Sequence, residues 1–332
     1  MGNTLSPAGV RLGLYGSGRT AAELVTALRS GPHSIEQGIV HAPRRAGSDL
    51  GELTIGAPIG VGTTSDLEAV LGSGKIELLL YAGLGGPRHI EAMALCAEYG
   101  VDMVHACFVH PRSSLPEPVY EALDAGARST GSRIVGTGMI PGLWLDVLPC
   151  LLSSGLPAPV SVEASRVSDI SAWGADVLAQ ELGVGSRREG TAVEPDRALR
   201  ESARMIADVL GLGELEPESQ GGLVAAGEDV IVGSLAVRRG QVLGFDQHVV
   251  LRQGESDRIR LSWRGLPGAG SAPGEKKAVE VTLTGADGSQ ILVQVSTPRD
   301  PYPGTAARMV SAVDGLQALG GGLHPTTALR IV

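Results

Sequence analysis

Mainly apolar runs of strand length alternate with helix-like stretches over residues 1–140 of the chain. Arg11–Tyr15, Ile76–Ala82 and Val101–Cys107 are each too short for a helix and show no polar alternation. Such runs suit strands buried on both faces, and their alternation with helices is typical of a parallel sheet with crossover helices. We therefore predict an α/β domain with a Rossmann-type, doubly wound parallel sheet. The same pattern predicts strands Ser34–His41 and Arg133–Val135 and helices Ser65–Leu71, Pro87–Tyr99 and Leu115–Thr130.

A different pattern begins near residue 160, where apolar and polar residues alternate in segments separated by turns. This alternation is typical of antiparallel strands with one buried face. It predicts a second α+β domain with a mostly antiparallel sheet over residues 141–303, and a C-terminal helix within 304–332 that packs back on the first domain. The predicted strands are Val160–Val167, Glu228–Arg238, Gln241–Arg252, Asp257–Trp263, Ala278–Thr284 and Gln290–Ser296, and the predicted helices are Leu143–Leu152, Ser171–Leu182, Pro195–Leu210 and Tyr302–Leu319.

Glycine and proline mark the predicted turns and the boundary between the domains. Arg239-Gly240 and Asp287-Gly288 are typical of hairpin junctions. Gly265–Lys277 is polar and rich in Gly and Pro, which predicts a mobile loop. Pro141 stands just before a predicted helix start, so we predict a hinge at this point.

A glycine-rich turn joins the first predicted strand to a helix with Leu24, Val25 and Leu28 on one face. Its sequence, GSGRTA at residues 16–21, matches the dinucleotide-binding pattern G-x-G-x-x-G/A. The small residues permit a tight turn, close approach to a pyrophosphate and close helix packing, and the helix N-terminus favours phosphate. An ordinary strand–helix turn is the alternative interpretation. The predicted cofactor-binding residues here are Gly16, Ser17, Gly18, Arg19 and Thr20.

The end of the second predicted strand bears on the choice of nicotinamide cofactor. A site for NAD places a carboxylate there, whereas Glu36 lies at the start of the strand, at the wrong edge of the sheet. The strand ends instead in a loop with Arg44 and Arg45, which suit a 2′-phosphate through charge-assisted hydrogen bonds. We predict NADP as the preferred cofactor, with NAD as the alternative, and His41, Arg44 and Arg45 as contacts. The alternative for this loop is a solvated surface segment.

Further candidates follow the predicted strands at their carboxyl ends, where ligands of open α/β sheets bind. Gly83 follows Ile76–Ala82, Cys107 ends Val101–Cys107, and Gly138 follows Arg133–Val135. We predict all three as cofactor contacts. His110 lies on the same edge and is the best-placed titratable side chain in the first half of the chain.

Composition and charge exclude several classes of function. A net charge of −9 without a basic tract argues against a nucleic-acid partner. No apolar run reaches the roughly 20 residues needed to span a bilayer, and the N-terminus does not read as a secretory signal. Three cysteines without a C-x-x-C motif fit a reducing cytoplasm and predict no zinc site. We therefore expect a cytoplasmic protein that acts on a small molecule.

Landmarks over almost the whole chain resemble the dihydrodipicolinate-reductase-like oxidoreductases, in the branch of 2,4-diaminopentanoate dehydrogenase and the native amine dehydrogenases. They are the Gly16-Ser17-Gly18 turn, Gly136-Thr137-Gly138 with Pro141-Gly142, Asp146 with Pro149, Trp263 with the strands after it, and TAARMV at residues 305–310. The resemblance implies a nucleotide-binding domain joined to a substrate and dimerisation domain, and a homodimer. It also implies NAD(P)-linked hydride transfer at a C–N bond, with imine reduction giving an amine.

The chain departs from the family pattern at three positions. Phe108 and Val109 stand in the loop where the family carries an acidic residue thought to handle the amine proton. Ile140 replaces the asparagine before Pro-Gly, and Ser311 replaces an asparagine of the C-terminal helix. His110 is the only nearby replacement for the acid.

Our leading interpretation is an NADPH-dependent reductase of a C=N or C=O group in a small metabolite. His110 is the predicted proton donor, since an imidazole pKa near ~6.5 suits that task, and Asp169 is the predicted contact of a cationic amine. Structural roles are the alternatives, for Asp169 a helix cap before Ser171. An alcohol or aldehyde dehydrogenase and a non-catalytic NADP-binding protein remain as alternative functions. The predicted substrate pocket comprises Phe108, Ile140, Trp144 and Trp173, with core packing as the alternative for the tryptophans.

Overall fold

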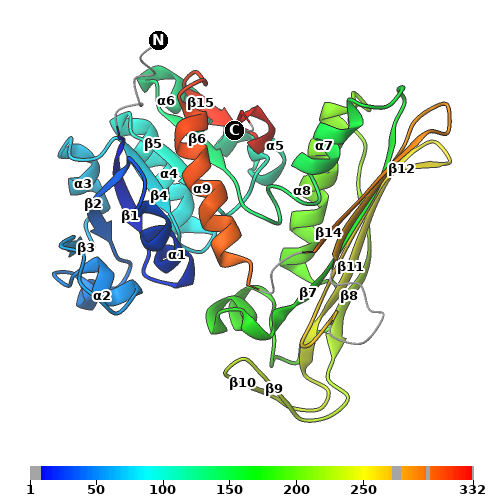
Figure 1. Cartoon of the computed structure of the whole chain (residues 1–332), viewed down its shortest axis with the longest axis horizontal. Coiled ribbons are helices and arrows are strands. Elements are labelled where there is room, and N and C mark those ends of the chain that lie inside the picture. Colours follow the sequence, from blue (N-terminus) through cyan, green and yellow to red (C-terminus); the bar gives the residue numbers. More distant parts are fainter. Residues whose placement is uncertain (1–8, 271–277, 297–299, 331–332) are drawn as a thin grey trace. The chain divides into compact units, whose positions relative to one another are not determined.

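The computed structural model describes residues 9–270, 278–296 and 300–330. The chain forms two compact units (Figure 1). The first comprises the residues up to Met139 together with those from Tyr302 onward, and the second is Ile140–Pro301. Each unit is described by itself below.

A parallel sheet forms the centre of the first unit. Its strands are β1 (Arg11–Tyr15), β2 (Ser34–Ile39), β3 (Thr63–Thr64), β4 (Leu78–Tyr81), β5 (Asp102–His105), β6 (Arg133–Gly136) and β15 (Gly322–His324). Within the described residues they lie in the order β15-β6-β5-β4-β1-β2-β3, and each neighbouring pair is parallel. The order reverses between β1 and β4, so the loops that follow these two strands diverge.

Helices cover both faces of this sheet because successive strand residues point to opposite sides. Leu12 and Leu14 of β1 belong to a core with α1 (Arg19–Leu28), α2 (Leu50–Thr54) and α9 (Tyr302–Leu316), and α9 packs against α1. Tyr15 belongs to a second core with α3 (Leu67–Gly72), α4 (Pro87–Tyr99) and α6 (Glu117–Thr130). Both faces are therefore buried, which confirms the predicted doubly wound α/β fold.

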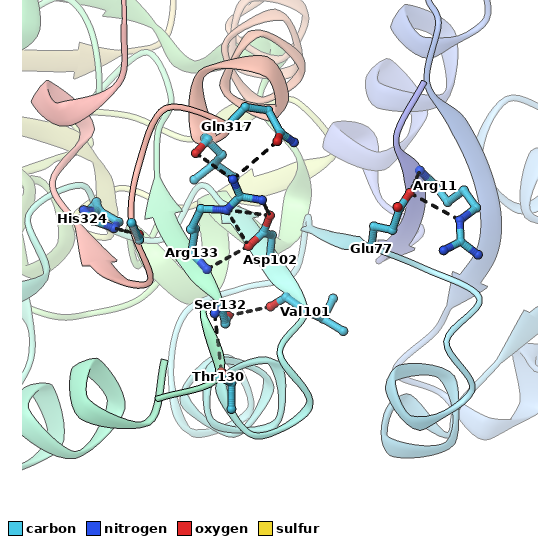
Figure 2. Close-up of polar contacts among 11 residues, drawn as sticks. Arg11, Glu77, Val101, Asp102, Thr130, Ser132, Arg133, Gln317 and His324 are labelled. Atoms are coloured by element: carbon cyan, nitrogen blue, oxygen red, sulfur yellow. Dashed lines mark hydrogen bonds and ion pairs between the residues drawn. The ribbon is translucent and has the colours of Figure 1, made fainter. Parts of the chain in front are cut away.

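An ion pair ties two strands of this sheet to the end of α9. The guanidinium of Arg133 on β6 donates from Nε to Asp102 Oδ1 and Oδ2 on β5, at 3.0 Å each, and the Arg133 backbone nitrogen donates to the same carboxylate at 2.8 Å. Arg133 Nη1 also donates to the carbonyl of Leu316 at 3.2 Å, and Figure 2 shows the guanidinium between Asp102 and Gln317. This link holds a C-terminal segment against strands more than 180 residues earlier in the chain.

A six-stranded mixed sheet forms the second unit. Its strands are β7 (Ser161–Asp169), β8 (Glu218–Ala225), β11 (Val242–Gln253), β12 (Ser256–Leu266), β13 (Ala278–Thr284) and β14 (Gln290–Ser296), in the order β14-β13-β7-β12-β11-β8. All neighbouring pairs are antiparallel except β7 and β12, which are parallel. The helices α7 (Val147–Ser153) and α8 (Val193–Val209) pack on one face (Figure 1). A mostly antiparallel sheet in an α+β unit was predicted and is confirmed.

Several local predictions for the second unit are wrong. Ser171–Leu182 is not one helix but a short 3-10 helix, Ile170–Ala172, and a π-helix, Val177–Glu181, because Trp173 between them is extended. The predicted strand Glu228–Arg238 is a hairpin of β9 (Val230–Val232) and β10 (Leu235–Val237), since Gly233 has a φ of +58°. The predicted helix Leu143–Leu152 begins only at Val147.

The strands β8 and β15 had no sequence prediction, and neither had the two-residue strand β3. β8 contains Gly221 and Gly222 at positive φ, and β15 follows a glycine run, so neither has the apolar alternation of an ordinary strand. In the first unit, Asp66 rather than Ser65 caps α3. Part of the loop predicted to be mobile, residues 271–277, lies outside the described residues.

No helix within the described part of the chain is long and apolar enough to cross a bilayer.

The Asp102–Arg133 ion pair yields a prediction about stability. Asp102→Ala leaves a largely buried guanidinium without its carboxylate, so we expect the free energy of unfolding to fall by about 3 kcal/mol in urea denaturation. Glu77→Ala is the control, because Glu77 and Arg11 form an exposed pair (Figure 2) and its loss is expected to change stability by less than about 1 kcal/mol. Equal losses in the two variants would contradict the prediction.

Candidate nucleotide-binding site

The glycine turn after β1 lies where the strand order reverses. Gly16 has a φ of +119°, and a Cβ there would stand 2.8 Å from the carbonyl oxygen of Ala82, just after β4. The Gly16 nitrogen donates to the Ile39 carbonyl at the end of β2, at 2.8 Å. Only glycine satisfies both the φ angle and this close approach. Residue 16 thus joins three strand ends at the carboxyl edge of the sheet.

Gly18 differs from Gly16 because no described residue requires it to be small. It is the N-cap of α1 with a φ of −90°, and a Cβ built on it meets no heavy atom of the described residues within 4 Å. The space beside Gly18 is therefore open, and α1 begins at the next residue without a hydrogen bond from a capping side chain. Ala21, fully buried on α1, provides the close packing of helix on sheet. The backbone of the turn, the open space beside Gly18 and the N-terminus of α1 form a place that suits a phosphate group.

The structure brings the predicted arginine loop to the glycine turn. Arg45 ends a 3-10 turn, Pro43–Arg45, after β2, and its Nη1 donates to Ser17 Oγ at 2.7 Å. The neighbouring candidates His41 and Arg44 are exposed on the same loop. Glu36 lies within β2 and accepts a hydrogen bond from Ser34 at 2.6 Å, away from the carboxyl end of the strand. The end of β2 therefore presents arginines and no carboxylate.

Arg19 contacts a residue that sequence analysis did not identify. Its guanidinium carbon lies 4.5 Å from the ring centroid of Tyr302, the first residue of α9. Arg19 is exposed, and Thr20 follows it, half-buried, in the first turn of α1. No sequence signal could reveal this pair, because its members are joined only by the packing of α9 on α1.

A row of packed rings lies beneath the loops at the carboxyl edge. Tyr15 stacks on Tyr81 at 4.6 Å between centroids, His89 lies 5.1 Å from Tyr81, and His105 lies 4.3 Å from His89 and 4.5 Å from Phe108. Phe108 is only 4% exposed and belongs to the core of the first unit. The structure thus places this predicted pocket residue in a core environment.

Gly83 and Cys107 connect two loops of this edge. A Cβ on Gly83 would lie 2.8 Å from the Tyr81 ring, and Cys107 Sγ lies 3.7 Å from the Gly83 carbonyl oxygen. Gly138, just after β6, is buried. All three predicted cofactor contacts therefore belong to the loops that follow β4, β5 and β6, while Gly138 offers little surface.

One group of potential metal ligands had no sequence signal, since it forms only on folding. The polar atoms of His89, His105 and Cys107 lie within 4.8 Å of one another. Burial and the neighbouring His89 hold the pKa of His105 well below its usual value, so its ring is neutral. The Cys107 nitrogen donates to His105 Nδ1 at 3.3 Å, which leaves the proton of the neutral ring on Nε2. A metal ion at Nε2 would have to displace that proton.

His110 lies just before α5 (Pro111–Ser114), at the same carboxyl edge. Its side chain is largely buried, and its Nδ1 lies 2.8 Å from Ser113 Oγ. The hydroxyl of Ser113 also donates to the His110 carbonyl oxygen at 3.2 Å. This geometry fixes the orientation of the imidazole and keeps Nδ1 engaged.

The remaining candidates belong to the second unit. Ile140, Trp144 and Trp173 pack against its core, and the Trp173 ring lies 6.0 Å from that of Trp263. Asp169 Oδ1 accepts hydrogen bonds from the Ser171 nitrogen at 3.0 Å, the Ser171 hydroxyl at 2.6 Å and the Gly268 nitrogen at 2.9 Å. Asp169 therefore caps the following 3-10 turn, which is the structural alternative stated above.

Comparison with known proteins identifies the relatives of this chain. No known family model matches it. It is 31% identical over 142 residues to an amine dehydrogenase of Streptomyces virginiae. The aligned residues cover 41% of this chain and 39% of that protein. It is 32% identical over 110 residues to 2,4-diaminopentanoate dehydrogenase of Acetoanaerobium sticklandii. This alignment covers 31% of this chain and 30% of that protein. The match thus spans less than half the length of these curated relatives.

Solved structures extend the similarity over nearly the whole chain. The amine dehydrogenase of Mycobacterium smegmatis superposes with a TM-score of 0.78 at 22% identity, covering 98% of this chain and 97% of that one. Dihydrodipicolinate reductase of Paenisporosarcina sp. TG-14 gives a TM-score of 0.54 at 14% identity, covering 97% and 100%. GenD2 in complex with NAD shares the fold at a TM-score of 0.53 and 14% identity, and the superposition covers 87% of this chain and 75% of that one. A biliverdin reductase of Synechocystis in complex with biliverdin and NADP+ also gives a TM-score of 0.53, at 13% identity, covering 92% of this chain and 90% of that one. These similarities confirm the predicted resemblance to dihydrodipicolinate-reductase-like oxidoreductases.

The different settings of Gly16 and Gly18 predict different effects of the same substitution. Gly18→Ala fits the free protein, so we expect an unchanged melting temperature but a dissociation constant for NADPH raised by about tenfold or more, because the methyl group occupies the open approach. Gly16→Ala is the control and should lose about 1–3 kcal/mol of stability through its φ angle. Calorimetric titration and thermal melts separate the two effects, and wild-type NADPH affinity in Gly18→Ala would refute the site.

Proposed function

We propose that this chain is an NAD(P)H-dependent oxidoreductase that reduces a C=N group of a small metabolite, as an amine dehydrogenase or imine reductase does. The observation that carries the proposal is the Gly16–Gly18 turn at the strand reversal, with the space before Gly18 open. Relatives named amine dehydrogenase and 2,4-diaminopentanoate dehydrogenase support the C–N chemistry.

NADPH is the cofactor we propose, with NADH as the alternative. Arg45 is already hydrogen-bonded to Ser17 of the turn, and Arg44 precedes it on the same exposed loop. Two guanidinium groups suit a 2′-phosphate, whereas a site for NAD holds a carboxylate at this strand end. The loop composition therefore favours the phosphorylated cofactor.

The residues of the first unit would hold the cofactor as follows. The backbone of Gly16–Gly18 and the N-terminus of α1 take the diphosphate, and Arg19, supported by the Tyr302 ring, adds a positive charge beside it. When bound, NADPH supplies a hydride, so that one imine, one NADPH and one proton give one amine and one NADP+. The chain must therefore orient the substrate, exclude water and deliver the proton.

We propose His110 as the group that delivers this proton. Its place at the carboxyl end of β5 is the loop in which the related enzymes carry an acid, and Ser113 fixes its ring. Phe108 and Val109 are buried in the first unit and have no proton to give. Asp169 is a weaker candidate for contact with a cationic amine, because its Oδ1 already accepts three hydrogen bonds.

A substrate panel tests the proposed reaction. Purified protein is incubated with NADPH or NADH, and absorbance is followed with ketone plus ammonia, cyclic imines and aldehydes. Oxidation of NADPH with the nitrogen-containing panels alone supports imine reduction. Turnover of aldehydes without ammonia supports the alcohol or aldehyde dehydrogenase alternative, and cofactor binding without turnover on any panel supports a non-catalytic protein.

Arg45 yields a prediction about cofactor choice. In Arg45→Ala the dissociation constant for NADPH should rise by about 10- to 100-fold, the effect of losing a hydrogen bond to a charged group, while that for NADH stays unchanged. Ser17→Ala removes the partner of Arg45 and keeps the guanidinium, so it should retain most of the preference. Equal losses for both cofactors would show that Arg45 does not recognise the 2′-phosphate.

His110 yields a prediction about the chemical step. His110→Ala should slow turnover by about 10²-fold if the imidazole is the general acid, with little effect on NADPH binding. Ser113→Ala is the matched control, because it removes the hydrogen bond to Nδ1 and keeps the ring. If both variants lose the same activity, His110 acts by holding the loop; an unaltered rate in His110→Ala removes it from the mechanism.

A further inference from the structure

Two histidines and a cysteine meet at the carboxyl edge of the first unit, although the sequence predicted no zinc site. His89 lies in the first turn of α4, His105 ends β5, and Cys107 follows two residues later. One ligand atom of each side chain, a ring nitrogen or Sγ, lies within 4.8 Å of the other two. The three residues come from a helix, a strand end and the loop after it, so the group exists only in the folded chain.

Both histidine rings are packed in the interior. Their residues are 1% and 0% exposed, and the two rings meet edge to face with 4.3 Å between centroids. Phe108 packs 5.2 Å from His89 and 4.5 Å from His105. A Cβ on Gly136 would stand 2.6 Å from His105 Cε1, so glycine at that position makes room for the ring. Rings held in this way lose little conformational entropy when they bind a ligand.

His105 has a polar atom in this interior that no hydrogen bond satisfies. Its Nε2 is buried and has no hydrogen-bond partner among the described residues. Such an atom is unfavourable, because it has lost its contact with water and no protein group replaces that contact. The atom therefore indicates a ligand in the cluster, and a metal ion is a ligand that imidazole and thiolate groups can share.

The ring proton of His105 does not prevent such a bond. Its Nδ1 accepts a hydrogen bond from the Cys107 nitrogen at 3.3 Å, which is at the long end of the usual range. When residue 107 shifts to bring Sγ to the metal ion, this hydrogen bond is released, and the ring proton passes to Nδ1 while Nε2 binds the ion. The thiol loses its own proton to the solvent, so that one metal ion is bound and one proton is released.

The donor set suits zinc. Zn2+ binds imidazole nitrogens and thiolate sulfur in tetrahedral sites, and three protein ligands leave a fourth position for water. Mg2+ and Ca2+ prefer oxygen ligands, and the group of three residues contains no carboxylate. Zinc is therefore expected to bind and magnesium is not.

We propose that His89, His105 and Cys107 bind a zinc ion, and that the bound ion opposes the binding of NADPH. Cys107 Sγ lies 3.7 Å from the Gly83 carbonyl oxygen, and a sulfur that turns to the metal ion no longer joins the loops after β4 and β5. Both loops belong to the candidate nucleotide edge. The zinc site depends on the first unit alone, and only its effect on the cofactor rests on the proposed function.

Metal binding without turnover tests the site directly. Untagged, reduced protein is freed of metal with a chelator and titrated separately with ZnCl2, CoCl2 and MgCl2. We expect calorimetry to show one zinc ion per chain and no binding of magnesium. Cobalt should give a thiolate-to-cobalt charge-transfer band in the near ultraviolet, since that band requires a sulfur ligand. A cobalt complex without the band, or magnesium binding as tight as that of zinc, would overturn the assignment.

Substitutions in the cluster separate metal binding from folding. Cys107→Ala should abolish the charge-transfer band and raise the dissociation constant for zinc by more than about 100-fold, because it removes a ligand of the ion itself. His89→Gln should weaken zinc binding likewise and repeats the test if Cys107→Ala does not fold. Cys150→Ala is the control, because it removes a buried cysteine of the second unit and should change neither readout. Zinc affinity that survives in Cys107→Ala would contradict the proposal.

The effect on the cofactor distinguishes this inference from the proposed function. Saturating zinc should raise the dissociation constant for NADPH by about tenfold or more, and linkage requires NADPH to weaken zinc binding by the same factor. NADPH affinity that bound zinc leaves unchanged would overturn the antagonism. Zinc binding that depends on Cys107 in a protein that binds no NADPH would support the metal site and refute the proposed function. Turnover with NADPH in a protein that binds no zinc would do the reverse.

Discussion

The close approach of Gly16 to the carbonyl oxygen of Ala82 is the constraint on which the carboxyl edge of the first unit depends. It joins the turn after β1 to the loop after β4 where the strand order reverses, and the Gly16 nitrogen adds the end of β2. With these three ends fixed, Gly18 is the N-cap of α1, and the space beside it is open among the described residues. The candidate nucleotide site is therefore a property of how neighbouring strands end, and needs no large side chain.

The same edge shows what surrounds the position at which the family pattern predicts an acidic residue. The loop after β5 carries Phe108 and Val109, which are buried, and Phe108 joins a row of rings that runs from Tyr15 through His89 and His105. A carboxylate at residue 108 would lose its hydration in that setting. The proposal of His110 as proton donor follows, since it is the next side chain along the loop that carries a transferable proton.

The second unit handles charge in a different way. Asp169 is satisfied by three hydrogen bonds from its own turn and the Gly268 nitrogen, whereas Arg166, three residues earlier, has one neutral partner among the described residues. The strand was predicted from its alternation, and an arginine at an inward-facing position of Val160–Val167 was the signal that sequence analysis overlooked.

The sequence alone determined the elements whose signal is local. β13 and β14 begin and end where alternation and Asp287-Gly288 predicted, and the turn after β1 follows from its glycines, because strand period and φ preference are set by neighbouring residues. Only tertiary structure decided the pairing of Arg19 with Tyr302, the parallel pairing of β7 with β12, and the strands β8 and β15. Each of these depends on contacts between residues far apart in the chain. The free energy of such contacts exceeds the local conformational preferences of the residues, and the contacts produce no periodic pattern in the sequence.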